Sequence, residues 1–436
     1  MHTFSIMFFS LRGQSVLEIK GDEVQINNFI LEFISIFSHS IDEDTFKIEI
    51  SSLQENTEAL RSGISDLVNR YKSSLPVINR LNTFIKRLDD GEYFYILPNV
   101  KKLSDSQTIS INNELLSHID KSVDLDSLQK SYKDIFQCVF DNYEMTSIST
   151  ERKIKIGEGL KANRVCRFCK KTIATGATFK KEAHAISESL GNKTIILNEE
   201  CDACNEYFSQ NVENNIFTYL KILVSFFGIK NKNNKISKIK GKNFEYINTG
   251  DNNIVLKFFE EDDEATKELP ASIPLKLYEK INKQSFYKAL CKFALSIIDS
   301  KNISQFDETI EWIRTGKVHE RLPKIATLAS YNFFDKHPRM VVYIRKNDNQ
   351  QLPFCVGEFH FTFLTFVFII PTFSSREDMF HDESKYEVFW NCFKHFKIIK
   401  DWKFEDYSDH YKREIVFNMN FLHNDITRHV SRFDMS

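Results

Sequence analysis

The sequence predicts a multidomain α+β protein, in which a cysteine-rich central module lies between a mixed α/β N-terminal domain and an α+β C-terminal region. The length of 436 residues is enough for two or three domains. Hydrophobic residues make up 42% of the chain and charged residues 27%, as in globular proteins. Stretches with helical spacing alternate with β-prone runs, and four of the eight cysteines form two CxxC pairs.

The first 150 residues predict the N-terminal mixed domain, and they contain no chemical motif. Two β-prone runs on either side of a turn predict a hairpin, and apolar residues at helical spacing predict helices. In chain order, the predicted elements are strands over 3–9 and 15–20, a helix over 24–37, strands over 46–50 and 93–97, and a helix over 115–140.

Residues 151–228 are predicted to form the central module, which closes with an amphipathic helix over 203–227. Residues 229–436 predict a C-terminal region that is first helical and then β-rich. Its predicted elements are a hairpin of 244–247 with 254–259, helices over 285–298 and 309–313, a strand over 340–344, and one long strand over 353–370.

The charges almost balance, since 58 Lys and Arg residues and 60 Asp and Glu residues give a net charge of −2. A histone-like protein is therefore excluded, and any nucleic-acid contact must come from a local basic patch. The first residues lack the positive segment of a signal peptide, and the longest apolar run, 361–370, is about half a membrane span. We expect a cytoplasmic protein with no membrane partner.

The two CxxC pairs predict a metal site. Cys166 and Cys169 form one pair, Cys201 and Cys204 the other, with 31 residues between the pairs. Each CxxC is a tight knuckle that directs two thiolates at one ion, and two knuckles complete the tetrahedral sulfur site that suits Zn²⁺. Because the protein fills all four positions, we interpret this zinc as structural.

Between the pairs the chain contains Glu182-Ala183-His184-Ala185-Ile186, and Asn205 directly follows the last cysteine. Together with the cysteines, this pattern resembles the HNH nucleases. It is similar to their zinc-bracketed treble-clef form within the ββα-metal group, which phage Holliday-junction resolvases of the endonuclease VII type share. That pattern runs CxxC, a strand ending in Asp-His or His-His, a second strand, and CxxC-Asn opening a helix. The resemblance covers about 60 of the 436 residues.

The resemblance implies a nuclease with a catalytic Mg²⁺ or Mn²⁺ beside the structural Zn²⁺. By resemblance, His184 is the general base and the side-chain oxygen of Asn205 is a metal ligand. A neutral histidine can take a proton from water near pH 7, and Mg²⁺ prefers oxygen ligands. An alternative for Asn205 is a helix cap, because Asn near a helix start can accept a backbone hydrogen bond.

One position departs from the family pattern. The residue before the base is usually a metal-ligating Asp or His, and here it is Ala183, which cannot ligate. A nearby carboxylate substitutes, or the metal is held weakly, or catalysis is lost. Strand alternation would turn Glu182 to the same face as His184. Glu188 lies in the following loop, and we prefer it because a loop can adapt its position.

Basic residues surround this motif. Residues 152–181 contain ten Lys or Arg residues and one acid, and residues 230–242 contain six lysines and no acid. Such patches would give sequence-independent affinity for phosphates, although a lysine-rich loop is also commonly just a solvated loop. DNA is the predicted partner, and RNA stays open.

The first hypothesis is therefore a metal-dependent HNH endonuclease that hydrolyses DNA phosphodiester bonds, with flanks that target, regulate or oligomerise it. By analogy, stand-alone HNH proteins with unfamiliar flanks resemble bacterial defence or mobile-element nucleases, so phage defence is a predicted setting. The alternative, which Ala183 favours, is a catalytically inactive zinc-stabilised module that binds nucleic acid or protein. A scaffold or sensor is a third hypothesis. A homo-oligomer or a regulatory partner stays open.

Overall fold

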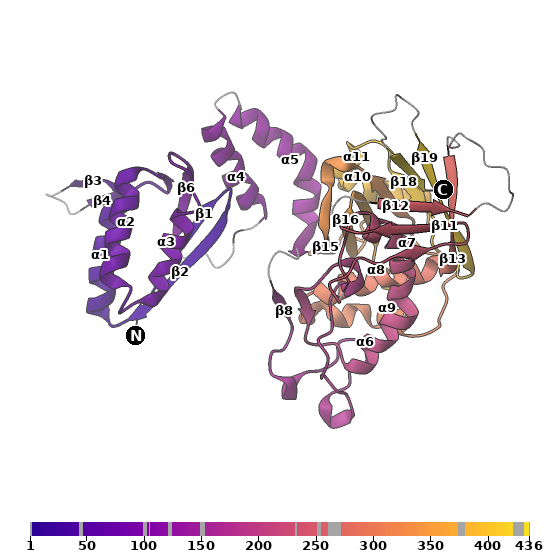
Figure 1. Cartoon of the computed structure of the whole chain (residues 1–436). Helices are drawn as coiled ribbons and strands as arrows, with labels where there is room; N and C mark the ends of the chain where they lie inside the picture. The colour runs from indigo at the N-terminus through magenta and orange to yellow at the C-terminus, as the bar shows by residue number, and fades with distance from the viewer. Residues whose placement is uncertain are drawn as a thin grey trace. The chain divides into compact units, whose positions relative to one another are not determined.

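The computed structural model forms two compact units, Met1–Phe140 and Asp141–Ser436 (Figure 1). Each unit mixes helices with strands, which confirms the predicted α+β class. The residues that the structure describes are 2–42, 47–98, 103, 105–120, 124–148, 153–231, 233–250, 254–259, 272–373, 380–421 and 431–435.

The first unit is built on a four-stranded sheet of order β2-β1-β6-β5. The predicted hairpin is confirmed, because β1 and β2 pair antiparallel along their whole length. Phenylalanines from the sheet and from α1 fill the core, where Phe8 and Phe33 are almost completely buried. The elements are β1 His2–Ser10, β2 Gly13–Gly21, α1 Glu23–Phe37, β3 Ser38–Asp42, β4 Lys47–Ile50, β5 Leu53–Glu55, α2 Glu58–Tyr71, α3 Asn79–Ile85, β6 Tyr93–Pro98, α4 Asp105–Ile119 and α5 Leu125–Asn142.

The single helix predicted over 115–140 is wrong, because α4 and α5 are separate helices. The second helix has its own start signal. The Asp124 carboxylate accepts hydrogen bonds from the Asp126 backbone and the Ser127 hydroxyl, at 3.2 and 2.7 Å. An aspartate in this position satisfies N–H groups that a new helix leaves without partners.

The second unit contains a six-stranded antiparallel sheet of order β18-β14-β17-β16-β15-β7. On one face α8 packs against β15 and β16, and on the other Phe393 contacts Tyr143 and Tyr343. The sheet and its helices are β7 Tyr143–Ile148, α8 Lys283–Ile297, α9 Asp307–Arg314, β14 Ile325–Ala329, β15 Asp335–Arg345, β16 Cys355–Thr362, β17 Leu364–Ile369, α10 Glu383–Cys392, α11 Lys394–Lys397 and β18 Lys403–Glu405.

The long strand predicted over 353–370 is also wrong, because it folds back on itself as β16 and β17. Thr362, the last residue of β16, has a positive φ of 54°. This left-handed conformation lets the chain reverse through a single residue, Phe363, before β17 begins. The apolar run has no Gly, Pro or Asn at this point to mark the turn, so its pattern alone reads as one strand.

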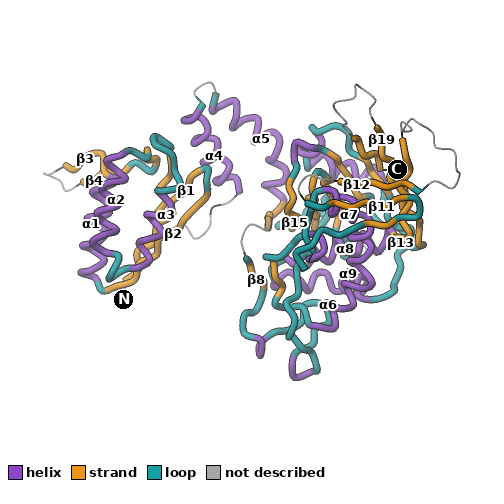
Figure 2. Tube along the Cα trace, in the orientation of Figure 1, coloured by secondary structure: helices purple, strands orange, loops and turns teal. Residues whose placement is uncertain are grey.

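The central module comprises β8 Ile154–Ile156, β9 Ile195–Leu197, α6 Asp202–Phe208, a π turn Ser209–Glu213 and α7 Asn214–Phe226. Figure 2 shows that most of the chain between β8 and α6 is loop. The predicted helix over 203–227 is confirmed, with the π turn inside it. Two smaller sheets follow, built from β10 Ile239–Lys240, β11 Phe244–Asn248 and β12 Ile254–Phe258, and from β13 Ser272–Asn282, β19 Lys412–Phe421 and β20 Ser431–Met435.

Module and C-terminal region share one hydrophobic core. Phe168 and Phe208 of the module belong to the same buried cluster as Phe286, Phe293 and Phe359. Helices α7 and α8 lie side by side at its centre (Figure 1). The module boundary at 228/229 stays a sequence prediction. In the described part of the chain, no helix has the length and apolarity needed to cross a membrane.

Candidate active site

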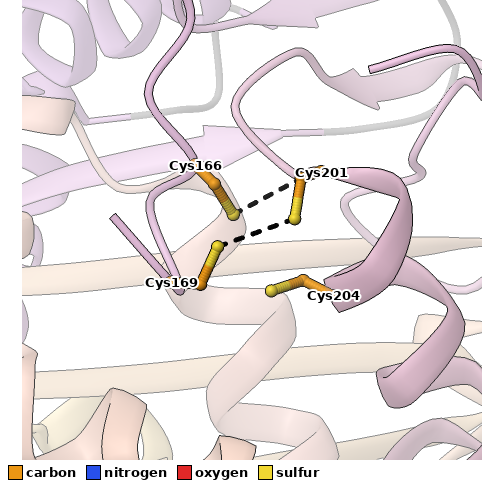
Figure 3. A group of neighbouring side chains, drawn as sticks. All are labelled: Cys166, Cys169, Cys201 and Cys204. Carbon is orange, nitrogen blue, oxygen red and sulfur yellow. Dashed lines mark hydrogen bonds between the residues drawn. The ribbon is translucent and has the colours of Figure 1, made fainter. Parts of the chain in front are cut away.

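The four cysteines predicted to bind zinc lie together (Figure 3). Their sulfur atoms all lie within 4.8 Å of one another, and Cys169 Sγ is 3.6 Å from Cys201 Sγ. With Zn–S bonds of about 2.3 Å, sulfurs at the corners of a tetrahedron lie about 3.8 Å apart. The cluster therefore has the donors and the spacing to hold Zn²⁺, with four protein ligands and no open position.

Local backbone geometry builds the cluster. Lys170 takes up the left-handed conformation (φ 59°), and its N–H donates to the Cys166 carbonyl at 2.8 Å, which closes the first knuckle. Cys201 is the N-cap residue of α6, and its backbone N–H donates to Cys166 Sγ at 3.5 Å. Hydrogen bonds from the thiols of Cys166 and Cys204 lower the pKa of Cys201, and the same contacts raise the pKa values of Cys166 and Cys204.

His184 lies on a short strand-like segment that pairs with β9. It is opposite Ile196 in an antiparallel bridge. The hydrogen bonds on either side run from Ala185 N–H to the Ile195 carbonyl at 3.0 Å and from Leu197 N–H to the Ala183 carbonyl at 2.8 Å. Ala183 and Ala185 are buried, and alternation turns His184 to the opposite side.

An open cleft of about 700 Å³ lies between this segment and the helix that follows the second CxxC. It contains every residue that the sequence analysis named for catalysis. Its lining residues are Lys181, Glu182, His184, Ser187, Glu188, Ser189, Asn205, Glu206, Ser209, Gln210, Glu213, Asn231 and Asn233.

The His184 imidazole is mostly buried, with 18% of its side chain exposed. Nε2 lies 3.8 Å from Glu188 Oε2, and Nδ1 is buried with no hydrogen-bond partner among the described residues. Burial lowers the pKa of His184, and the nearby charge of Glu188 opposes this effect only in part. The ring is therefore neutral near pH 7, the form that can accept a proton.

The two candidate carboxylates occupy different parts of the cleft. Glu188 is closest to the imidazole, and its side chain is 36% exposed. Glu182 is 56% exposed and forms an ion pair with Lys153 at 3.4 Å. Ala183 itself is only 2% exposed, and its methyl group offers no ligand atom to the cleft. Both glutamates can offer oxygen atoms to a cation, and Glu188 can do so beside His184.

Asn205 lies in the first turn of α6 and lines the cleft. The N-cap of this helix is Cys201, and the backbone N–H of Asn205 donates to its carbonyl at 3.0 Å. Asn205 therefore does not cap α6. Its amide oxygen is a hard donor of the kind that Mg²⁺ prefers.

A buried charge cluster behind the cleft was missed by the sequence analysis. Lys292 of α8 is completely buried, and its Nζ lies 2.8 Å from Glu213 Oε1 and 3.2 Å from Glu200 Oε2. Nζ also donates to the His184 carbonyl oxygen at 3.0 Å. Burial alone would lower the pKa of Lys292, but the two carboxylates raise it, so Lys292 is charged. A lysine within the apolar run Ala289–Leu295 was the available signal.

The basic surroundings are only partly as expected. Lys180 and Lys181 are exposed, and Lys181 lines the cleft. Asn231 and Asn233 of the lysine-rich loop line it as well. Arg167, however, is not a surface residue, because its side chain is 2% exposed and lies 2.7 Å from Glu199. Lys232 of that loop lies outside the described residues.

Residues 166–220 match the family model of HNH endonucleases. The comparisons with curated proteins and with solved structures gave no match. The matched segment contains both cysteine pairs, His184 and Asn205, and it ends before α8 begins. The resemblance predicted from the sequence is therefore confirmed for this segment. HNH endonucleases are nucleases that use divalent metals, so the segment indicates a metal-dependent nuclease.

Proposed function

We propose that this protein is a metal-dependent endonuclease that hydrolyses phosphodiester bonds of DNA. One observation carries the proposal. His184, Glu188 and Asn205 line a single cleft, beside a four-cysteine cluster and within the segment that matches the HNH endonucleases. This arrangement places a neutral base beside the Glu188 carboxylate on one wall of the cleft and the Asn205 amide on the helix wall.

His184 acts as the general base. Its Nε2 is the nitrogen on the side of Glu188, and a water in the cleft can donate a hydrogen bond to it. As this water attacks phosphorus, Nε2 takes its proton, which contributes roughly 10²–10⁴-fold to the rate. The buried environment keeps the imidazole neutral before the reaction, and Glu188 stabilises the imidazolium that forms.

The donors in the cleft fit a hard divalent cation such as Mg²⁺ or Mn²⁺. The Asn205 amide and the Glu188 carboxylate would hold it, with Glu182 as the other candidate carboxylate. One or two protein oxygens are enough, because Mg²⁺ keeps several of its waters. A bound cation would stabilise negative charge on the phosphate and on the leaving oxygen.

Glu188 is the proposed replacement for the ligand absent at Ala183. Its carboxylate lies next to His184, whereas Glu182 is more exposed and is engaged with Lys153. Mn²⁺ binding measured by electron paramagnetic resonance decides between them. We expect Glu188→Gln to weaken Mn²⁺ binding more than Glu182→Gln. The reverse order would assign the ligand to Glu182.

The decisive experiment is plasmid cleavage by the purified full-length protein with Mg²⁺, Mn²⁺ or EDTA. We expect metal-dependent nicking that disappears in His184→Ala and persists in His337→Ala, an exposed histidine on β15. Zinc content of all three proteins controls for misfolding. Absence of cleavage with zinc bound and DNA binding intact would instead establish a binding module.

RNA substrates in the same assay test whether the protein cleaves RNA as well as DNA. Phage plating on bacteria that carry the protein tests the proposed setting of bacterial defence.

A further inference from the structure

Lys292 is a buried residue that contacts both walls of the cleft, the segment bearing His184 and the helix bearing Asn205 and Glu213. It belongs to α8, outside the segment that matches the HNH endonucleases. We propose that Lys292 is a positioning residue, which holds the segment bearing His184 at a fixed distance from the helix bearing Asn205. The inference rests on the proposed nuclease function, and it makes the catalytic geometry depend on the C-terminal region.

The first contact of Lys292 is with the backbone of the base. His184 and Ile196 form the type of antiparallel pair that does not exchange hydrogen bonds directly, since the bonds run through Ala185 and Ala183. The carbonyl of His184 therefore points away from β9. Lys292 Nζ donates to this carbonyl oxygen at 3.0 Å. The position of the imidazole along the segment is thus fixed from the α8 side.

The second contact is with the helix wall. Glu213 lies eight residues after Asn205, and in a regular α-helix that separation turns a side chain by about 80° beyond two full turns. The π turn Ser209–Glu213 underwinds the helix and returns Glu213 to the face of Asn205. Both residues consequently line the cleft. Lys292 binds this wall through Glu213 Oε1 at 2.8 Å.

The third contact links the same lysine to the cysteine cluster. Glu200 immediately precedes Cys201, is completely buried, and places Oε2 3.2 Å from Nζ. Lys292 thus donates a hydrogen bond to one carbonyl and forms ion pairs with two glutamates, in a site without exposure to solvent. Among the described residues, neither side-chain oxygen of Glu200 has a hydrogen-bond partner, so Glu200 is held by charge alone.

Helix α8 offers a matched control. Lys288 lies one turn before Lys292 and is also buried, with 6% exposure. Its Nζ donates to the carbonyls of Thr315 and Lys317, at 3.1 and 2.8 Å, and it does not line the active-site cleft. Replacing either lysine removes a buried ammonium from α8, but only Lys292 contacts the residues that build the cleft.

The experiment compares Lys292→Met and Lys288→Met in the full-length protein. Because Lys292→Met leaves two carboxylates without their cation, the double variant Lys292→Met with Glu200→Gln is made as a second, better-folding form. We measure melting temperature, zinc content, kcat and KM for cleavage, and the ¹³C-labelled ring signal of His184, assigned by its loss in His184→Gln. Misplacement of a reacting group by about 1 Å costs on the order of 100-fold.

We expect kcat of both Lys292 variants to fall about 100-fold, with KM changed less than about threefold. The His184 signal should shift in these variants alone, and Lys288→Met should retain wild-type kcat and signal. The inference would be overturned if zinc-replete Lys292 variants kept the kcat and the His184 ring signal of the wild type, as Lys288→Met is expected to do. If the wild-type protein does not cleave, the proposed function fails, and the His184 signal still decides whether Lys292 positions the imidazole.

Discussion

Replacing Arg167 separates a structural role from a role in binding nucleic acid. The basic segment before His184 suggested that Arg167 faces a phosphate backbone. Its guanidinium instead donates to the carbonyls of Leu295 and Ile298, at 2.7 and 3.0 Å, and to Glu199 Oε2 at 2.7 Å. These contacts tie the first CxxC knuckle to the C-terminal end of α8. Arg167→Met should therefore destabilise the unit without changing phosphate contacts.

The magnitude follows from what the substitution leaves behind. Glu199, with 13% of its side chain exposed, loses its cation, and two buried carbonyls lose their donor. Removing one partner of a buried pair costs about 3–5 kcal/mol in the free energy of unfolding. In a domain of this size that corresponds to a fall in melting temperature of roughly 5–15 °C. Lysine should not rescue the fold, because it lacks the planar fork that reaches all three acceptors.

The assay pairs differential scanning fluorimetry with DNA affinity measured at several salt concentrations. Lys181→Met is the control, since Lys181 is exposed and lines the cleft. We expect it to change stability by less than about 0.5 kcal/mol and to reduce the slope of log affinity against log salt by about 0.9. An Arg167→Met protein with an unchanged melting temperature and a reduced salt slope would refute the reasoning.

Three further predictions concern pH and metal. Burial lowers the pKa of His184. The rate should fall in acid as His184 becomes protonated, with a midpoint below pH 6.5, the ordinary histidine value. A midpoint above pH 6.5 would contradict this prediction. Burial alone would raise the pKa of Glu199, but hydrogen bonds from Arg167 and Ser300 lower it overall. The ionised Glu199 therefore stabilises the folded protein above pH 4.5, its ordinary pKa. This stabilisation is lost as the pH falls through the lower pKa that Glu199 has in the folded protein. The difference in melting temperature between wild type and Arg167→Met should accordingly narrow in acid to the part that the two carbonyls contribute, and a constant difference down to pH 2 would count against the pairing with Glu199. Cys204→Ser should reduce bound zinc well below one ion per chain and expose the module to limited proteolysis, and a zinc-replete, protease-resistant variant would show that the cysteines do not form the site.

Local spacing was enough to predict the cysteine cluster, and the family resemblance pointed to residues that the structure places in one cleft. A CxxC knuckle is closed by hydrogen bonds within six residues, and His184 and Asn205 are tied to these knuckles by short segments of strand and helix. Strand alternation likewise placed Glu182 and His184 on one side and Ala183 on the other. Such relations depend on backbone geometry over a few residues, which a sequence pattern can express.

Predictions failed where a local pattern had two structural solutions. The apolar run 353–370 is compatible with one buried strand or with two strands and a tight turn, and only the sheet partners decide between them. The helical pattern after residue 115 is interrupted where Asp124 starts a new helix. In both cases periodicity identified the type of element but not its boundaries.

By itself, the sequence determined which chemical groups lie close together: four cysteines, a histidine, and oxygen donors near them along the chain. The tertiary structure alone decided what holds these groups in place. Lys292 reaches the His184 carbonyl across 108 residues, and Arg167 reaches that of Leu295 across 128. A charged side chain is stable in a core only when distant segments bring it partners, and no local pattern of residues records which segments those are.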